Sequence, residues 1–334
     1  MSRPVPREPL LFRRLLKEKV WGGTRLAALL GVKPPAAGPL GESWELSDYP
    51  GEETVVRGGA WNGISLRALM QDHATTLLGR SRTTADGRFP LLVKFLDAGD
   101  DLSVQIHPPD GPLSPTGVGK TEAWYVLDAK PGATVICGLK AGTRREVFEA
   151  EAGDARVRAH LHSVPVRRGD CVFVPAGQTH AIRGGVVLCE VQQTSDVTFR
   201  MYDWDRAGLD GKPRATHLPE ALAAVDWRLE PGAAVRAHYR ENGGLQDATL
   251  AQCAYFRLAM LRADAAGGLR STDGLARVWT IVSGSGHLEP VGADRFPQLP
   301  LRFGDVALIP GGLENVRLVG DGDDGIEILE GVAL

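Results

Sequence analysis

The sequence predicts a mainly β protein built from two β-barrel (jelly-roll) modules with short helical insertions. It contains 41 glycines and 22 prolines in 334 residues, a larger share than the roughly 12% of an average chain, so the chain turns often. From residue 89 onward, short apolar runs recur about every ten residues, which is the spacing of antiparallel sandwiches and barrels. A glycine–proline motif also occurs twice at identical spacing, which indicates duplication.

The first 90 residues predict a mixture of strands and helices. Residues 10–12 are apolar and predict a short strand, and residues 21–30 predict a helical stretch. Residues 41–47 alternate apolar and polar side chains, as a half-buried strand does. Residues 65–78 carry leucine and methionine at helical spacing and predict an amphipathic helix.

The remaining chain predicts strands with two helical interruptions. The predicted strands of the first β region are residues 91–96, 124–127, 133–137, 171–174 and 186–189. One or two helices are expected within residues 143–162, and another helix is expected at residues 219–225. The strand pattern resumes after residue 255 and continues to the C-terminus.

The two β regions share one motif. Residues 169–180 follow the pattern G-x5-P-x-G-x2-H, and residues 304–315 follow G-x5-P-x-G-x2-N. Each copy is preceded by a tryptophan-containing strand. Where the first copy has Glu122 and His180, the second has Arg277 and Asn315. A metal held by the first pair therefore has no equivalent in the second copy, and we expect a single site.

Composition and charge exclude several classes of protein. Hydrophobic residues make 43% of the chain and charged residues 24%, as in ordinary globular proteins. The net charge of −3 gives no basic field for nucleic acid. No run reaches the roughly 18 apolar residues of a membrane span. The N-terminus lacks the apolar run of a signal peptide and the four cysteines are scattered, so we expect a cytoplasmic protein without disulfides.

The strongest candidate for a metal site is the set of Gln105, His107, Glu122 and His180. Gln105 and His107 are two apart in a strand-like segment, so their side chains point the same way. Imidazole, carboxylate and amide oxygen are acceptable ligands for a divalent metal such as zinc, and an open coordination position marks a catalytic site. The alternative is that both histidines are ordinary turn or core residues; the glycine–proline frame around His180 argues against it.

The chain resembles a known family. G-x5-P-x-G-x2-H is the second motif of the cupin superfamily, and the remaining motifs resemble the short bacterial form of type I mannose-6-phosphate isomerase. These motifs are VWGG at 20–23, GESWELS at 41–47, FPLLVKFLDA at 89–98, LSVQIHP at 102–108, GKTEAWY at 119–125, VPAGQTHA at 174–181 and TFRMYDWDR at 198–206. The match extends from about residue 11 to 206 and continues weakly through the second module.

The resemblance implies one Zn²⁺ per chain, with Gln105, His107, Glu122 and His180 as ligands. It also implies that Arg200 and Lys120 are catalytic residues. Lys94 lies in a family motif, and we expect Lys94 and Arg200 to bind the substrate. The implied reaction interconverts mannose 6-phosphate and fructose 6-phosphate by moving a proton between C1 and C2 through an enediol.

Such a reaction needs a Lewis acid for oxyanion charge, a base for the carbon acid and a cation for the phosphate. Arg200 would clamp the phosphate or stabilise the enediolate. Lys120 would shuttle a proton if burial beside zinc lowers its pKa. The base is left open between Lys120, a zinc-bound water and a neighbouring carboxylate.

Each assignment has a simpler alternative. Lys94 would merely point outward from its sheet, Lys120 would be solvated, and Arg200 would be a structural ion-pair partner of Asp203 or Asp205. Three tryptophans near these motifs fit the protein core better than sugar stacking, since large aromatic side chains are mostly buried. They are Trp21, Trp44 and Trp124.

The predicted organisation places an N-terminal segment and the catalytic metal-binding module in residues 1–240, and a degenerate module without metal ligands in residues 241–334. Two rival functions remain: an iron cupin that acts on oxygen, and a non-catalytic regulator that binds a sugar phosphate. The expected partner is a small sugar phosphate, with no nucleic acid and no membrane, and the protein is expected to be a monomer or a homodimer.

Overall fold

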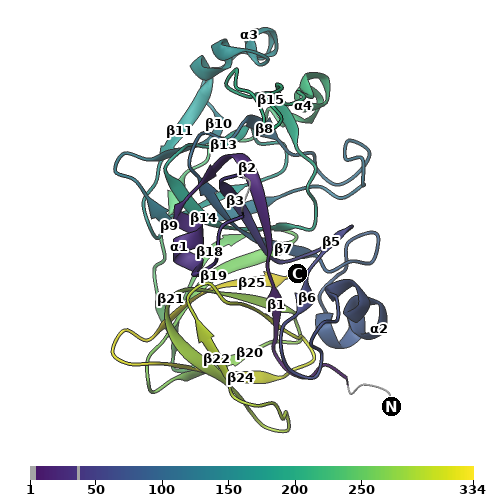
Figure 1. Ribbon diagram of the computed structural model, residues 1–334, viewed down its shortest axis with the longest axis vertical. Helices are drawn as coiled ribbons and strands as arrows, with labels where there is room; N and C mark the ends of the chain where they lie inside the picture. Colours follow the sequence, from purple (N-terminus) through teal and green to yellow (C-terminus); the bar gives the residue numbers. More distant parts are fainter. Residues whose placement is uncertain (1–4, 36–37) are drawn as a thin grey trace. The chain divides into compact units, whose positions relative to one another are not determined.

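The computed structural model describes residues 5–35 and 38–334 and confirms the mainly β fold (Figure 1). The chain divides into two compact units. One comprises Leu16–Trp44 and Val93–Arg236, and the other comprises Glu45–Leu92, Ala237–Leu334 and the described part of Met1–Leu15. The first four residues, part of the N-terminus that was expected to lack a signal peptide, lie outside the described residues. No helix in the described ranges has the length and apolar character needed to cross a membrane.

The unit formed by Leu16–Trp44 and Val93–Arg236 contains two antiparallel sheets. The seven-stranded sheet has the order β16-β12-β9-β14-β7-β2-β3, and the five-stranded sheet has the order β11-β10-β13-β8-β15. The strands are β2 (Leu15–Gly23), β3 (Leu40–Leu46), β7 (Leu91–Ala98), β8 (Val104–Ile106), β9 (Glu122–Ala129), β10 (Thr134–Leu139), β11 (Leu161–Pro165), β12 (Cys171–Val174), β13 (His180–Ile182), β14 (Val186–Gln193), β15 (Phe199–Tyr202) and β16 (Ala234–Val235). The helices are α1 (Arg25–Leu30), α3 (Arg145–Glu151), the short 3-10 helix η1 (Ala155–Ala159) and α4 (Leu218–Ala224). Both helical insertions are therefore where the sequence predicts them.

Strand alternation divides the five-stranded sheet into two chemically different faces. Val135 and Ile182 pack inward with Trp124 and Leu188 of the seven-stranded sheet. Their neighbours on the other face form a separate cluster, which includes residues of α3, η1 and α4. Because successive side chains of a strand point to opposite faces, the apolar outer face made by Val104 and Ile106 directs Gln105 to the inner face.

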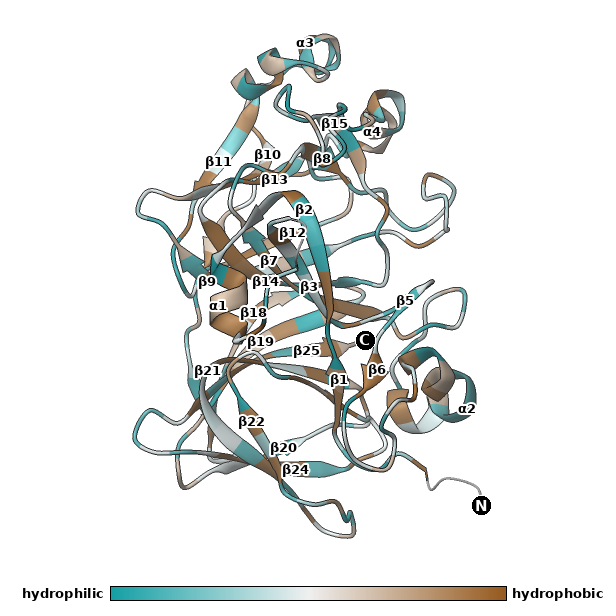
Figure 2. Ribbon diagram, viewed as in Figure 1, coloured by the Kyte–Doolittle hydropathy of each residue, from teal (hydrophilic) through white to brown (hydrophobic). Residues whose placement is uncertain are grey.

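The other unit is built on one large sheet and a helix. Its main strand order is β17-β18-β19-β25-β21-β23-β1-β6, with β20, β22 and β24 attached, and β4 pairs with β5 separately. The strands are β1 (Leu10–Arg13), β4 (Asp48–Tyr49), β5 (Glu52–Glu53), β6 (Val55–Val56), β17 (Arg240–Asn242), β18 (Leu245–Gln252), β19 (Phe256–Ala263), β20 (Gly268–Ser271), β21 (Arg277–Pro290), β22 (Leu299–Arg302), β23 (Val306–Ile309), β24 (Asn315–Gly320) and β25 (Ile326–Ala333). Helix α2 (Leu66–Leu78) has the predicted bounds, because the Ser65 side chain accepts a hydrogen bond from the Ala68 N–H as its N-cap. It shows one apolar and one polar side (Figure 2). Among the described strands of either unit, no closure into a continuous barrel is found.

The duplication is present in the hydrogen-bond registers. Trp124 of β9 pairs with Val172 of β12, and Trp279 of β21 pairs with Ala307 of β23. Both partners lie three residues after the first glycine of their motif. In the same way Glu122 pairs with Val174, and its counterpart Arg277 pairs with Ile309. The two copies of the motif thus fold into the same strand pairs.

A second correspondence was not found in the sequence. Trp124 also pairs with Glu190 of β14, and its indole Nε1–H donates to Glu190 Oε2 over 3.1 Å. Trp279 pairs with Glu330 of β25, and its Nε1–H donates to Glu330 Oε2 over 3.0 Å. Each module therefore contains a buried glutamate held by the tryptophan of the neighbouring strand.

Two predictions of local structure were wrong. Residues 21–23 continue β2 instead of starting a helix, and α1 begins only at Arg25. Glycine permits this close strand contact, because a Cβ on Gly22 would lie 2.6 Å from the Pro39 carbonyl oxygen. The strand at residues 41–47 is buried on both faces, not one. Its polar side chains are tolerated because they are paired, as Glu42 is with Lys19 and with the Trp44 indole.

We expect Glu330→Gln to destabilise the protein by about 3 kcal/mol, because it removes the buried carboxylate that two guanidinium groups share and leaves them only the more exposed carboxylates of Asp247 and Asp273. Glu330 Oε1 lies 3.1 Å from Arg277 Nη1, and Oε2 lies 3.1 Å from Arg270 Nε. Burial alone would raise the pKa of Glu330, but the facing Arg277 and Arg270 outweigh it and lower the pKa. The change in free energy of unfolding is measured by urea denaturation.

Glu327→Gln is the matched control, because it makes the same change on the same strand in a pair with Arg262 that is partly exposed. It should cost less than about 1 kcal/mol. Equal costs for the two variants would contradict a special role for the Glu330 cluster.

Candidate metal centre

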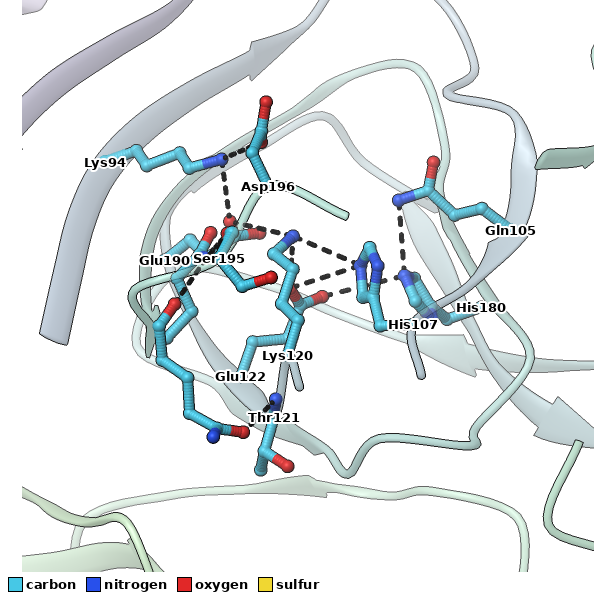
Figure 3. A network of polar contacts seen from close by, with 12 residues as sticks. Lys94, Gln105, His107, Lys120, Thr121, Glu122, His180, Glu190, Ser195 and Asp196 are labelled. Atoms are coloured by element: carbon cyan, nitrogen blue, oxygen red, sulfur yellow. Dashed lines mark hydrogen bonds and ion pairs between the residues drawn. The ribbon is translucent and has the colours of Figure 1, made fainter. Parts of the chain in front are cut away.

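Three strands bring the predicted ligands to one place. Gln105 of β8 pairs directly with His180 of β13, so their side chains share the inner face of the five-stranded sheet. His107 follows β8 two residues after Gln105 and lies on the same side. Glu122 begins β9 in the facing sheet. Figure 3 shows the carboxylate of Glu122 directed at both imidazole rings.

The donor atoms of His107, Glu122 and His180 are spaced as the ligands of one metal ion would be. His107 Nε2 lies 3.5 Å from Glu122 Oε2, and His180 Nε2 lies 3.7 Å from Glu122 Oε1. All three donor atoms lie within 4.8 Å of one another, and all three residues are buried. Ligands about 2.0–2.2 Å from one tetrahedral ion are roughly 3.4 Å apart. The spacing therefore fits a single ion.

Hydrogen bonds fix the ring orientation of both histidines. His107 Nδ1–H donates to the Val197 carbonyl over 2.8 Å, and His180 Nδ1–H donates to the Gln178 carbonyl over 2.8 Å. This tautomer makes each Nε2 an acceptor, which faces Lys120 Nζ at 3.1 Å in His107 and the Gln105 side-chain nitrogen in His180, and a bound metal would take the place of these donors. Burial, aided by Lys120, lowers the pKa of both rings, that of His180 to about 4, so both are neutral at pH 7. Neutral imidazole is the form that binds a metal.

Two further atoms fit a cation here. Glu122 Oε2 is buried and accepts no hydrogen bond, although the Lys120 ammonium lies 2.7 Å from it. The Gln105 side-chain nitrogen lies 3.3 Å from His180 Nε2, and its oxygen accepts from the Ser103 hydroxyl. Rotation of the amide exchanges these atoms and turns the oxygen toward the His180 ring. The donor set thus becomes two nitrogens and two oxygens.

Next to Glu122, buried ammonium and carboxylate groups alternate in a row. Lys120 lies between Glu122 and Glu190, 3.5 Å from Glu190 Oε1, and Lys94 lies 3.6 Å from the same oxygen (Figure 3). Lys94 also contacts Asp196 at 3.2 Å. Burial lowers the pKa of Lys120, but Glu122 and Glu190 outweigh it and raise the pKa. Both lysines are therefore ammonium groups in this arrangement.

A cavity of about 260 Å³ opens beside this row of charges. The predicted ligands Gln105 and Glu122 line it together with Lys94, Lys120 and Arg200. Trp21 and Trp124 form apolar parts of the wall. The cavity therefore combines metal-binding groups, cations and hydrocarbon surface, which suits a small anionic ligand.

Comparison with known proteins identifies the family. A family model described as "Phosphomannose isomerase type I, catalytic domain" matches residues 10–136. The mannose-6-phosphate isomerase ManA of Bacillus subtilis (strain 168) is 34% identical over 319 residues, which cover 94% of this chain and 96% of the relative. The chain belongs to the type I phosphomannose isomerase family. The mannose-6-phosphate isomerase of Streptococcus mutans is also 34% identical, over 318 residues, with the same shares covered.

The fold supports the same family. The crystal structure of the mannose 6-phosphate isomerase from Bacillus subtilis matches with a TM-score of 0.86 at 28% identity, covering 97% of this chain and 99% of that chain. This family membership confirms the resemblance inferred from the motifs. Gln105 and Glu122, which line the cavity, lie within residues 10–136 that the family model matches.

Within this family member, the structure removes the simpler alternatives for three cations. Lys94 does not point outward; it is 2% exposed and faces the Trp44 ring at 4.6 Å. Lys120 is buried and not solvated. Among the described residues no carboxylate lies within 4.0 Å of the Arg200 guanidinium, which instead donates to the Ser103 hydroxyl and the Ala215 carbonyl.

The acidic partners of these lysines were missed in the sequence. Glu42, Glu190 and Asp196 all line the cavity. A signal for Glu190 exists, because Gly185 and Gly325 each precede a glutamate by five residues, at Glu190 and Glu330. The three tryptophans expected in the core, Trp21, Trp44 and Trp124, are all buried.

We expect Glu42→Gln to lower the free energy of unfolding by about 2–3 kcal/mol at pH 7, because it removes a buried countercharge. Burial alone would raise the pKa of Glu42, but Lys94, Lys19 and the Trp44 indole lower it to about 2. A lowered carboxyl pKa contributes stability above about pH 4.5 that is lost as the pH falls toward 2. The difference between the two proteins should therefore shrink across that window in urea denaturation.

The control is Glu220→Gln at an exposed position of α4. Its effect should stay within about 0.5 kcal/mol at every pH. A Glu42→Gln effect that stays constant from pH 6 to pH 3 would contradict the charge argument.

Proposed function

We propose that this protein interconverts mannose 6-phosphate and fructose 6-phosphate with one Zn²⁺ per chain, held by Gln105, His107, Glu122 and His180. The observation that carries the proposal is the buried His107–Glu122–His180 cluster at a cation-lined cavity in a chain of this family. Nitrogen and oxygen donors with an open side toward a cavity suit catalytic zinc. The bound metal would supply Lewis-acid stabilisation of negative charge on a substrate oxygen.

The residues around the cavity divide the remaining tasks. Lys120 is a buried ammonium beside the ligands and is placed to donate a hydrogen bond or a proton to a substrate oxygen. Arg200 has no carboxylate partner among the described residues and is placed to bind phosphate. Lys94 is fixed between Glu190 and Asp196, so it contributes positive potential at the cavity wall. Proton transfer between C1 and C2 then proceeds through an enediol in a shielded site.

Three carboxylates that line the cavity are candidates for the base. Glu42 and Glu190 are almost fully buried, whereas the Asp196 side chain is 39% exposed. Without a metal, Glu122 and Glu190 outweigh burial and raise the pKa of Lys120, so its ammonium can donate a proton to a substrate oxygen. The base stays open between Lys120, a zinc-bound water and one of these carboxylates.

The second module supports the fold in this proposal and binds no metal. Arg277 occupies the strand position of Glu122, and Asn315 that of His180. The division into a catalytic module within residues 1–240 and a degenerate module in residues 241–334 stays a prediction. So do the cytoplasmic location and the choice between monomer and homodimer.

The proposal is tested by a coupled assay for fructose 6-phosphate formed from mannose 6-phosphate. The protein is assayed as purified, after dialysis against chelator, and after addition of one equivalent of Zn²⁺. We expect chelation to remove at least about 99% of the activity and zinc to restore it, because stabilising the oxyanion is worth several kcal/mol. Inactivity in all three states would overturn the isomerase assignment and favour an iron oxygenase or a regulator. Metal analysis distinguishes these two.

We expect His180→Ala to lower bound zinc from about one to less than about 0.1 per chain, because three donors remain in place of four. Zinc content is measured by elemental analysis after gel filtration, with far-UV circular dichroism to verify the fold. His162→Ala is the control, since His162 lies on β11 of the same sheet and away from the ligands. Full zinc content in His180→Ala would remove that residue from the ligand set.

A further inference from the structure

A second guanidinium lines the cavity, and no motif drew attention to it. Arg214 belongs to the loop that follows β15 and faces the same cavity as Arg200. The Asp203 carboxylate holds it in a two-point contact, with Arg214 Nε 2.7 Å from Oδ2 and Nη2 2.5 Å from Oδ1. This geometry leaves Arg214 Nη1 without a hydrogen bond among the described residues.

The loop is shaped to bring Arg214 back to the cavity. Trp204 and Asp205 adopt φ values of 58° and 55°, in the left-handed region that residues other than glycine rarely enter. Such residues cost roughly 1–3 kcal/mol each and persist where the surroundings hold them. The Trp204 indole donates to the Leu102 carbonyl over 2.6 Å, and the Asp205 carboxylate accepts from the Tyr202 hydroxyl over 2.7 Å. Farther along, Ala207 bridges to Pro213 and closes the loop.

Asp203 holds a second arginine that serves as an internal comparison. Arg206 Nη2 lies 2.9 Å from Asp203 Oδ1, and its Nη1 lies 3.2 Å from Asp100. Arg206 does not line the cavity, whereas Arg214 does. The Asp203 carboxylate therefore binds both arginines, but only Arg214 lines the cavity.

The position of the arginine pair matches the length of the substrate. Arg200 donates to the hydroxyl of Ser103, which lies two residues before Gln105. Residues i and i+2 of a strand are about 7 Å apart on one face. A six-carbon sugar phosphate spans this distance when its C1–C2 end is at the metal ligands. Its phosphate would then lie by Ser103 and Arg200, in the cavity that Arg214 also lines.

We propose that Arg214 is a specificity-determining residue that binds the substrate phosphate together with Arg200, and that Asp203 is the positioning residue that aims it. The inference rests on the proposed function. Arg200 supplies one positive charge to a phosphate dianion, and Arg214 would supply a second guanidinium in the same cavity. Asp203 satisfies Nε and Nη2 of Arg214, so the guanidinium is held rigid while Nη1 remains available for a phosphate oxygen.

The test compares Arg214→Gln with Arg206→Gln in the zinc-loaded enzyme. Both variants remove one arginine from the same aspartate, so they share any damage to the loop. We expect Arg214→Gln to raise the KM for mannose 6-phosphate about 10- to 100-fold with kcat within about 3-fold, because a charge-assisted contact to the non-reacting phosphate is lost. The inhibition constant of inorganic phosphate should rise to a similar degree. Arg206→Gln should change neither value more than about 3-fold.

Three results would overturn the inference. The first is an unchanged KM and phosphate inhibition constant in Arg214→Gln. The second is an equal rise in Arg206→Gln, which would assign the effect to the loop. The third is a loss confined to kcat. If Arg214→Gln does not fold, Arg214→Lys takes its place: it keeps the charge and loses the two-point contact with Asp203, so its KM should exceed that of the wild type with kcat within about 3-fold. A wild-type protein that fails to isomerise mannose 6-phosphate would instead overturn the proposed function.

Discussion

Each module contains a carboxylate buried against a tryptophan, and the charge of that carboxylate governs what can surround it. Isolated ionised carboxylates are too costly to bury, so cations must accompany Glu190 and Glu330. Around Glu330 the cations are Arg270 and Arg277, whose guanidinium groups saturate its oxygens. Around Glu190 they are Lys94 and Lys120. The buried carboxylate is thus neutralised by rigid guanidinium groups in one module and by flexible ammonium groups in the other.

The choice of arginine around Glu330 and lysine around Glu190 makes the first cluster rigid and the second able to rearrange. Arginine remains charged and has a fixed planar geometry, so the cluster around Glu330 is held in one arrangement. Lysine is a compact charge on a flexible stem and can exchange partners. Lys120 contacts Glu122, Glu190 and the His107 ring, so a metal ion at the histidines would change its partners directly. The ligands and the row of charges therefore form one electrostatic unit.

Sequence reasoning was most successful where local rules decide the outcome. The spacing of Gln105 and His107 and the glycine–proline motif before His180 predicted which side chains meet, because strand alternation and turn chemistry act over a few residues. It failed at residues 21–23, where the approach of a neighbouring strand decides the conformation. Glu190 and Arg214 were missed for a related reason. Their importance comes from partners 66 and 11 residues away, Trp124 and Asp203, which pattern alone does not connect.

The position of Arg277 also bears on the history of the duplicated modules. Restoring a carboxylate there would place it beside the Glu330 carboxylate and remove one of the two guanidinium groups that Glu330 contacts most closely. Restoring the histidine at Asn315 alone would give a ligand without companions. Neither substitution alone supplies both residues, and we expect the carboxylate at position 277 to destabilise the fold. The salt bridge between Arg277 and Glu330 therefore constrains any route by which the second copy could acquire a metal centre like the one proposed for the first.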